Sequence, residues 1–347
     1  MKILALESSC DETAAAVLEF DEQENAKVLS ECVYTQAKEH FDYGGVVPEI
    51  ASRAHLEKFD NLIKKTMDDS ELKYSDIDAI AATVGPGLLG GLLIGTMYGK
   101  SLALSLDVPF IPVNHLEGHA LIANLTNKVE FPFLLFLASG GHCQFIEVKD
   151  FGEYEIIGGT IDDAVGEAFD KVAKMLKLTF PGGPKLEKLA IGGDPLAYKF
   201  PEPLKHKGLD FSFSGLKTAV RTQILKHDGE LTEQQRKDIA ASFQHTVVKL
   251  VIHKVKKAMQ ETGMERFVLA GGVAANKMLR EELEVFCSKN NIELTLPAIK
   301  WATDNAVMIG YAGGIRYFDK ANPIDYKNLE VKPTPRWPLA SLKKVEL

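Results

Sequence analysis

The chain has 347 residues, of which 46% are hydrophobic and 25% are charged. This composition predicts an ordered globular protein with enough apolar surface for two cores, and it argues against a largely disordered chain. The formal net charge of −8 argues against a protein that binds nucleic acid by itself, because such proteins are usually basic.

Cysteine usage and hydropathy bear on where the protein works. The four cysteines are widely spaced and form no CxxC pair, so we expect a reducing compartment and no disulfide framework. The apolar start of the chain is interrupted by Glu7, and the most apolar run, Val84 to Met97, is shorter than the ~20 residues that span a bilayer. We expect a cytoplasmic protein without a membrane partner.

The first element is an apolar strand, Lys2 to Leu6. A polar turn over residues 7–13 follows, and then a second apolar run, Ala14 to Leu18. This pattern predicts a β-hairpin whose turn is rich in hydroxyl and carboxylate groups.

A similar pattern recurs in the second half of the chain. Phe133 to Leu137 leads through a small polar turn, residues 138–142, into Cys143 to Val148. In each half a further short apolar strand runs into a glycine-rich turn and a helix, at Asp78 to Thr83 and at Arg266 to Ala270. The chain therefore carries a weak internal repeat.

Two related α/β halves, each with a Ser/Gly hairpin, favour an actin-like ATPase (ASKHA) fold with a central cleft for nucleotide and metal. The alternative is one doubly wound sheet with ordinary turns. We place the first lobe at residues 1–130 plus 296–347 and the second lobe at residues 131–295.

The strongest local signal is a histidine pair in the segment NHLEGHA. On a helix, His115 and His119 are separated by about 40° and share one face, which suits a transition metal. Glu117 lies roughly 200° around the helix from His115, so it should point away from such a metal. This geometry disfavours a peptidase of the HExxH type, in which the glutamate is the general base.

The spacing alone does not assign a third ligand. Asp304, at the start of an apolar helix over Ala306 to Gly314, is a candidate. A helix N-cap is the alternative role for this aspartate, and the sequence pattern favours it.

Four glycine-rich turns, at residues 84–87, 139–141, 181–184 and 270–276, could bring backbone N–H groups close to a phosphate. None of them is a Walker A or GxGxxG motif. Together they are moderate evidence for a nucleotide ligand.

A cluster of carboxylates follows the second hairpin. If the segment is helical, Asp163, Glu167 and Asp170 share one face, which could bind a ribose. A solvated first turn of a helix is an equally good interpretation.

The order of these motifs over residues 7–339 resembles the TsaD family of tRNA-modifying transferases. The matching segments are ESSCDET, QAKEHFDYGGVVPEIASRAH, VGPGLLGGLLIG, NHLEGH, ASGGHCQF, TIDDAVGEAFDKVAKML, PGGP, FSFSGLKTAV, GGVAANKMLR, TDNAVMIGYAGG and PRWPL. The resemblance implies an actin-like fold. It also implies transfer of threonylcarbamoyl from threonylcarbamoyl-AMP to N6 of the adenosine beside the anticodon, in tRNAs that read codons beginning with A.

The resemblance further implies a metal site and a nucleotide site. The implied metal ligands are His115, His119 and Asp304, with Fe²⁺ the expected ion and Zn²⁺ an alternative. The implied nucleotide contacts are Leu137, Ala138, Ser139, Gly140, Gly141, Asp170, Gly183, Glu187 and Asn276. The family often has aspartate where this chain has Glu187, so the reach of that carboxylate differs by one methylene. Asp11 and Glu12 are our candidates for orienting or deprotonating the attacking amine.

The implied partners are tRNA, a TsaB-like paralogue and a TsaE-like ATPase. A tRNA-binding surface formed jointly with these partners would explain how an acidic chain binds tRNA. The helix-forming stretch Gly91 to Leu106 could contact the paralogue or be an ordinary core helix. The alternatives are a kinase or ATPase of the same fold, which leaves the histidine pair unexplained, and a non-catalytic scaffold, which needs no metal ligands.

Overall fold

The computed structural model describes residues 1–227, 230–320 and 329–344. The chain forms two compact units. Unit 1 comprises Met1–Val129, Asp150–Tyr154 and Asp304–Leu347, and unit 2 comprises Glu130–Lys149 and Glu155–Thr303. Of the tail assigned to the first lobe, residues 321–328 and 345–347 lie outside the described residues, and residues 296–303 cluster with unit 2. The lobe boundaries remain a prediction.

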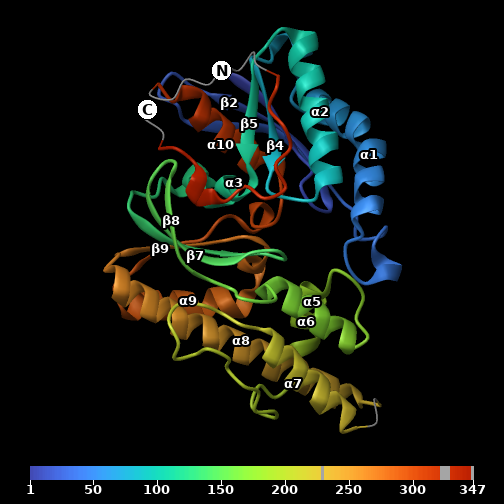
Figure 1. Cartoon of the computed structure of the whole chain (residues 1–347), viewed down its shortest axis with the longest axis vertical. Coiled ribbons are helices and arrows are strands. Elements are labelled where there is room, and N and C mark those ends of the chain that lie inside the picture. Colours follow the sequence, from blue (N-terminus) through green and yellow to red (C-terminus); the bar gives the residue numbers. More distant parts are fainter. Residues whose placement is uncertain (228–229, 321–328, 345–347) are drawn as a thin grey trace. The chain divides into compact units, whose positions relative to one another are not determined.

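The sheet of unit 1 has the strand order β3-β2-β1-β4-β5. Its strands β2, β4 and β5 are labelled in Figure 1. Its strands are β1 (Lys2–Glu7), β2 (Glu12–Phe20), β3 (Ala26–Thr35), β4 (Ala79–Gly85) and β5 (Phe110–Asn114). The first three strands pair antiparallel, whereas β4 and β5 continue the sheet in parallel from β1. The predicted first hairpin is confirmed, with Leu6 opposite Ala15.

Both faces of this sheet are covered by helices. The helices of unit 1 are α1 (Pro48–Asp69), α2 (Leu89–Leu106), α3 (His115–Leu121), α4 (Asn124–Asn127) and α10 (Ala306–Phe318), with 3-10 turns at Phe41–Tyr43, Tyr74–Asp76 and Leu339–Ser341. Leu4 and Leu6 share a core with Phe59 of α1, while Ala5, on the other face, contacts α10 at Gly310. This two-sided burial explains why β1 is apolar throughout.

Close packing explains the glycines of α2. A Cβ on Gly91 would lie 2.2 Å from the carbonyl oxygen of Ser8, and one on Gly95 would lie 2.2 Å from the Ser8 hydroxyl. The Ser8 hydroxyl donates a hydrogen bond to the Gly91 carbonyl at 2.9 Å. The absence of side chains at these glycines therefore allows the β1–β2 turn to pack directly against the helix.

Among the described residues, α2 is long and apolar enough to span a membrane by length and composition. It extends to Leu106, beyond the apolar run that the sequence analysis considered too short. A third of its window is buried within the protein, and core helices pass the same test, so this is weak evidence for a membrane span.

The sheet of unit 2 has the order β10-β9-β6-β7-β8. Its strands are β6 (Phe133–Ala138), β7 (Cys143–Asp150), β8 (Glu153–Gly159), β9 (Arg266–Ala270) and β10 (Glu293–Thr295). The hairpin β6–β7 is antiparallel, and β9 and β10 extend the sheet in parallel. The same sequence of pairings as in unit 1 confirms the two related α/β halves.

The helices of unit 2 are α5 (Val165–Met175), α6 (Gly182–Ala190), α7 (Ser214–Leu225), α8 (Glu233–Thr262) and α9 (Lys277–Lys289), with 3-10 turns at Gly272–Ala275 and Ile299–Trp301. The long helix α8 begins with a capping box, in which Thr232 and Gln235 bond each other's backbone N–H groups. It ends at Gly263, whose φ of 65° suits a left-handed cap. Phe243 and Val247 place α8 in the core of this unit.

Candidate metal centre and nucleotide site

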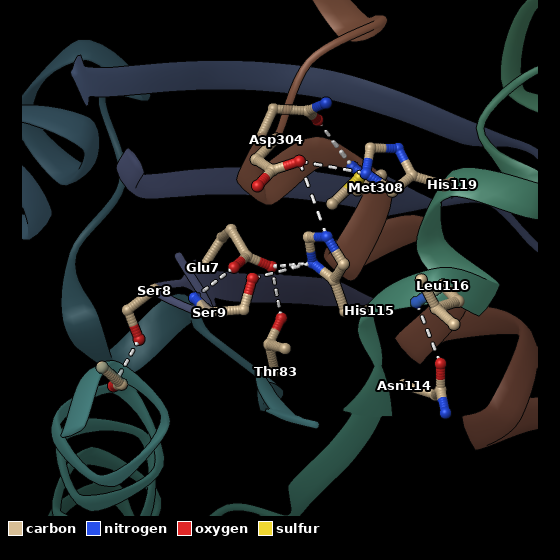
Figure 2. A network of polar contacts seen from close by, with 12 residues as sticks. Glu7, Ser8, Ser9, Thr83, Asn114, His115, Leu116, His119, Asp304 and Met308 are labelled. Atoms are coloured by element: carbon tan, nitrogen blue, oxygen red, sulfur yellow. Dashed lines mark hydrogen bonds and ion pairs between the residues drawn. The ribbon is translucent and has the colours of Figure 1, made fainter. Parts of the chain in front are cut away.

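The histidine pair lies on one face of α3, as predicted (Figure 2). Asn114 caps the helix by accepting hydrogen bonds from the backbone N–H groups of Leu116 and Glu117. His119 Nε2 lies 3.0 Å from Asp304 Oδ1, and His115 Nε2 lies 3.5 Å from the same oxygen. Both histidines are buried. The three side chains therefore converge on one point inside unit 1.

The structure shows where Asp304 lies relative to the start of α10. The cap of α10 is the neighbouring Asn305, whose side chain accepts a hydrogen bond from the backbone N–H of Met308 at 2.9 Å. The carboxylate of Asp304 points instead toward His115 and His119 (Figure 2). The interpretation of Asp304 as an N-cap is wrong, because the helix begins at Ala306, as predicted, and Asn305 rather than Asp304 occupies the cap position.

A second carboxylate contacts His115 at Nδ1, the ring nitrogen that does not face Asp304. Glu7, at the end of β1, lies 3.1 Å from His115 Nδ1 through Oε2 and also accepts hydrogen bonds from the Thr83 hydroxyl and the Ser9 backbone. The Ser9 hydroxyl lies 3.1 Å from the same histidine nitrogen. A carboxylate on the outer nitrogen of a histidine fixes the ring and makes it a stronger metal ligand. This role of Glu7 was not predicted from the sequence, although a glutamate at the end of an apolar strand was an available signal.

Electrostatics in this cluster favour a cation. Burial alone would lower the pKa of His115, but the carboxylates of Glu7 and Asp304 outweigh it and raise that pKa well above its usual range. Burial would raise the pKa of Asp304, yet His115 and His119 hold it well below its ordinary value. A divalent ion would feel the same negative field.

The residues present fit a metal ion. One ligand atom from each of His115, His119 and Asp304 lies within 4.8 Å of the others. Ligands bound at about 2.0–2.2 Å lie roughly 3–3.5 Å apart, which matches both histidine–aspartate distances. Two imidazoles and one carboxylate suit iron or zinc, and they leave coordination positions open for a substrate.

Glu117 points away from this cluster, as the helical geometry predicts. Its carboxylate accepts hydrogen bonds from Nη2 and Nε of Arg316, at 2.5 and 2.9 Å, and from the Tyr154 hydroxyl at 2.8 Å. Arg316 also donates to the carbonyl oxygen of Lys343. The glutamate thus fastens α3 to α10, and it cannot serve as a general base at the metal ligands.

In the same unit, Asp11 lies in the β1–β2 turn and Glu12 is the first residue of β2. Burial, and then the charges of Asp11 and Asp304, raise the pKa of Glu12 well above its ordinary value. Burial also raises the pKa of Asp11. The neighbouring Cys10 keeps its thiol protonated, because burial and these carboxylates raise its pKa, so it is a poor nucleophile.

A chain of buried hydrogen bonds fixes the β1–β2 turn at Cys10. His55 Nε2 lies 3.1 Å from the carbonyl oxygen of Cys10, which can only accept, so this nitrogen carries the proton. The other nitrogen, Nδ1, then accepts from the Thr13 hydroxyl at 2.8 Å and from the Gln36 amide at 3.2 Å. Burial lowers the pKa of His55, in agreement with a neutral ring.

The chain continues through His40. Its Nε2 lies 3.2 Å from the Gln36 amide oxygen, and its Nδ1 accepts from the backbone N–H of Val47 at 3.3 Å. All these groups are matched as donor and acceptor. Sequence reasoning missed this chain, because its members lie in β2, in α1 and in the loops next to these elements.

In unit 2, the predicted nucleotide residues gather at one edge of the sheet. Strands β6 and β9 are parallel, with Leu137 beside Ala270, so the turns that follow them lie side by side. A Cβ on Gly271 would lie 2.4 Å from the carbonyl oxygen of Ala138, which requires a glycine there. The turn Ser139–Gly141 is held by the Ser139 hydroxyl, which accepts from the backbone N–H of Gly141. Nothing lies within 4 Å of a Cβ on Gly140 or Gly141.

The remaining predicted residues are tied to helix starts beside these turns. Asp170 Oδ1 accepts hydrogen bonds from the backbone N–H groups of Gly182 and Gly183, at 2.7 and 3.2 Å. Glu187 Oε1 accepts from the backbone N–H of Lys277 at 2.7 Å. Asn276 caps α9 through the N–H of Leu279 and donates to Gln244.

The proposed acidic face of α5 is not formed. Asp163 precedes the helix and pairs with Lys171 and Lys217, while Glu167 pairs with Lys171 at 2.6 Å. Asp170 is directed to the glycine turn of α6 instead. The condition that the whole segment is helical fails at Ala164, where the helix is capped.

Comparison with known proteins decides the family. Residues 27–311 match the family TsaD, described as tRNA N6-adenosine threonylcarbamoyltransferase. The chain belongs to the TsaD family. It is 48% identical to a protein of that name from Brucella anthropi, over 98% of this chain and 95% of that protein. It is 49% identical to a protein of the same name from Rickettsia rickettsii, over 99% of each chain.

Solved structures agree with this family at the level of the fold. The chain superposes on HypF from T. kodakarensis with a TM-score of 0.58 at 16% identity, over 90% of this chain and 47% of that one. It superposes on the activator of the 2-hydroxyisocaproyl-CoA dehydratase from Clostridium difficile with a TM-score of 0.51 at 15% identity, over 94% and 100% of the two chains. These likenesses confirm the predicted actin-like (ASKHA) α/β fold and carry no information about activity.

Proposed function

We propose that this chain transfers the threonylcarbamoyl group of threonylcarbamoyl-AMP to N6 of the adenosine next to the anticodon, position 37, in tRNAs that read codons beginning with A. The observation that carries the proposal is the family match, which extends over nearly the whole chain at 48–49% identity. The alternative of an ASKHA kinase or ATPase is not favoured by these relatives.

The reaction is an acyl transfer. The N6 nitrogen attacks the carbamoyl carbon, a C–N bond forms, and the bond between that carbon and the phosphate oxygen breaks. AMP leaves with the electron pair, and the amine proton passes to a base. Because AMP is a good leaving group and the N6 lone pair is delocalised, catalysis depends on positioning and on stabilising negative charge.

His115, His119 and Asp304 are the residues that would hold a divalent metal ion, Fe²⁺ by family resemblance and Zn²⁺ as an alternative. When bound, such an ion polarises a carbonyl or neutralises a phosphate. The donor set, the distances of 3.0 and 3.5 Å and the Glu7 support behind His115 favour this assignment.

We assign the orientation of the amine, and acceptance of its proton, to Asp11 and Glu12. Asp11 lies at the end of the turn that the His55 chain fixes and Glu12 begins β2, in the same unit as the candidate metal ligands. A raised pKa makes Glu12 a better proton acceptor once it is ionised.

We assign the adenylate to the sheet edge of unit 2. The turn Ser139–Gly141 has open space around Gly140 and Gly141, and the backbone N–H of Gly140 is the donor that we assign to a phosphate. The other proposed contacts are Leu137, Ala138, Asp170, Gly183, Glu187 and Asn276. Asp170, Glu187 and Asn276 already hold backbone groups, so they would act partly by shaping the glycine turns.

We further propose that the chain works in the cytoplasm with a TsaB-like paralogue and a TsaE-like ATPase. One side of α2 exposes large apolar residues at helical spacing, namely Leu89, Leu93, Met97 and Leu104. Such a stripe suits a partner helix.

The test is product identification. Purified chain, partners, tRNA and threonylcarbamoyl-AMP are incubated, and the tRNA nucleosides are separated by liquid chromatography with mass spectrometry. We expect threonylcarbamoyladenosine at position 37 together with one AMP for each nucleoside formed. ATP-dependent phosphorylation of a small molecule without nucleoside modification would favour the kinase alternative instead.

A further inference from the structure

A basic surface forms in unit 2 where residues 201–210 lie against α8. The sequence shows two separate lysine clusters, and the structure joins them. Segments 201–210 and 249–261 together contain six lysines and three carboxylates, whereas the whole chain has 40 basic and 48 acidic residues. We call this region the α8 basic surface, which consists of Lys205, His206, Lys207, Lys249, His253 and Lys256.

A buried lysine fixes the loop. Lys254 is fully buried, and its ammonium donates to the carbonyl oxygens of Leu204, Lys207 and Gly208 at 2.6, 2.9 and 2.9 Å. These bonds use all three donors of the ammonium group. Leu204 has a φ of 53°, a left-handed conformation that is unfavourable for a leucine. The loop is therefore held in a defined shape rather than lying loosely on the surface.

Two side-chain links connect the loop to the helix. The rings of His206 and His253 meet edge to face, with centroids 5.3 Å apart. Glu202 bridges Lys205 of the loop, at 2.7 Å, and Lys249 of α8, at 3.1 Å. These contacts hold the basic groups of the loop and those of α8 at fixed positions relative to one another.

The basic side chains that α8 contributes to this surface share one face of the helix. On α8, Lys249, His253 and Lys256 lie within about 60° of arc. Lys207 and Lys256 are exposed, and within the described part of the chain neither side chain forms an ion pair. Partial burial, and then repulsion by Lys205 and His206, lower the pKa of His253, which indicates a positive local potential.

We propose that the α8 basic surface binds the sugar–phosphate backbone of the tRNA substrate, an inference that rests on the function proposed above. Lysine ammonium groups that are not neutralised by carboxylates bind phosphates by releasing counterions. Such contacts position a nucleic acid without reading its sequence. A local excess of lysine also explains how an acidic chain contributes to tRNA binding.

The test uses charge reversal at the two unpaired lysines. In the presence of the partner proteins, the Kd for tRNA is measured at several salt concentrations for the wild type, Lys207→Glu and Lys256→Glu. We expect each variant to raise the Kd roughly 3- to 10-fold and to reduce the slope of log K against log salt by about 1. The KM for tRNA should rise in parallel, and the KM for the adenylate should not.

Lys177→Glu is the matched control. Lys177 is exposed, and the preceding residue, Leu176, contacts Arg236 near the start of α8, about 30 Å along that helix from Lys256. We expect its Kd to stay within about 2-fold of the wild type. Unchanged binding in Lys207→Glu and Lys256→Glu, equal weakening in Lys177→Glu, or loss of partner-protein binding with tRNA binding retained would each overturn the proposal. A wild type that binds tRNA through this surface yet forms no modified nucleoside would reject the proposed function alone.

Discussion

Among single residues, Glu7 has the most direct influence on the candidate metal centre without being a ligand. Its carboxylate contacts His115 Nδ1 and is itself held by Thr83 and the Ser9 backbone. Such outer carboxylates orient the imidazole and increase its basicity. The site therefore depends on a residue more than 100 positions from its nearest ligand in sequence.

Replacing Glu7 by glutamine should weaken metal binding about 10- to 100-fold while the protein stays folded, because the amide keeps the shape and loses the charge. Titration with Fe²⁺ or Zn²⁺, followed by calorimetry, measures the change. Ser8→Ala is the control, since the Ser8 hydroxyl bonds the Gly91 carbonyl and contacts no ligand. Equal affinity in Glu7→Gln and the wild type would refute this role.

The buried pair of Glu117 and Arg316 should dominate stability near α3. Glu117→Ala removes the carboxylate that binds the buried Arg316 guanidinium and the acceptor of the Tyr154 hydroxyl, so we expect a loss of about 3–5 kcal/mol in the free energy of unfolding. Urea denaturation measures it. The control is Glu49→Ala, whose partner Arg53 is 75% exposed and whose loss should cost less than about 1 kcal/mol. Similar losses in both variants would contradict the assignment.

Residue periodicity predicted the shared face of His115 and His119 and the direction of Glu117 away from them, because both follow from helix geometry alone. The role of Asp304 stayed open, because the sequence pattern does not distinguish an N-cap at Asp304 from an N-cap at the next residue, Asn305. Arg316 and Tyr154 could not be paired with Glu117 from the sequence, because their contact depends on how α3, α10 and the segment 150–154 pack.

At the scale of elements, the start of α7 shows how a motif shapes a helix. Asp162 Oδ1 accepts from the backbone N–H groups of Phe213 and Ser214, at 2.8 and 3.3 Å, and Oδ2 accepts from the Ser212 hydroxyl. Burial opposes ionisation, but these hydrogen bonds outweigh it and lower the pKa of Asp162.

Asp162→Asn should reduce the free energy of unfolding by about 1 kcal/mol at pH 7, a modest loss because the carboxylate is exposed. A lowered folded-state pKa stabilises the fold above the unfolded value of about 3.9, and this contribution disappears as the pH falls through the folded value. Urea titrations from pH 7 to pH 3 should therefore show the difference between wild type and variant shrinking below about pH 4. A difference independent of pH would refute the charged cap.

Strand prediction succeeded where apolar runs are bounded by sharp turns. Strand β9 has the predicted bounds, and both hairpins lie where the alternation of apolar and polar segments placed them. The carboxylate face at Asp163 was not formed, because the capped start of α5 excludes that residue from the helix. Glycine turns could not be separated by pattern into those that pack closely, such as Gly91, and those with open space, such as Gly140.

For the whole molecule, the excess of 48 acidic over 40 basic residues predicts that tRNA modification depends on partner proteins. We expect the chain alone to modify tRNA poorly, and a TsaB-like and a TsaE-like protein to restore turnover, because phosphate binding gains most of its free energy from lysine and arginine. Threonylcarbamoyladenosine formation with and without partners measures this. Multiple turnovers by the chain alone, at the rate of the full set, would contradict it.

The central claim is that His115, His119 and Asp304 together hold one metal ion. Anomalous diffraction from crystals of the metal-loaded protein, recorded above and below the absorption edge of iron or zinc, tests it directly. We predict one peak within about 2.0–2.2 Å of an imidazole nitrogen of each histidine and of an Asp304 oxygen, and no peak in His119→Ala crystals. A loaded wild-type crystal without a peak at these residues, or with the ion bound elsewhere, would contradict the account.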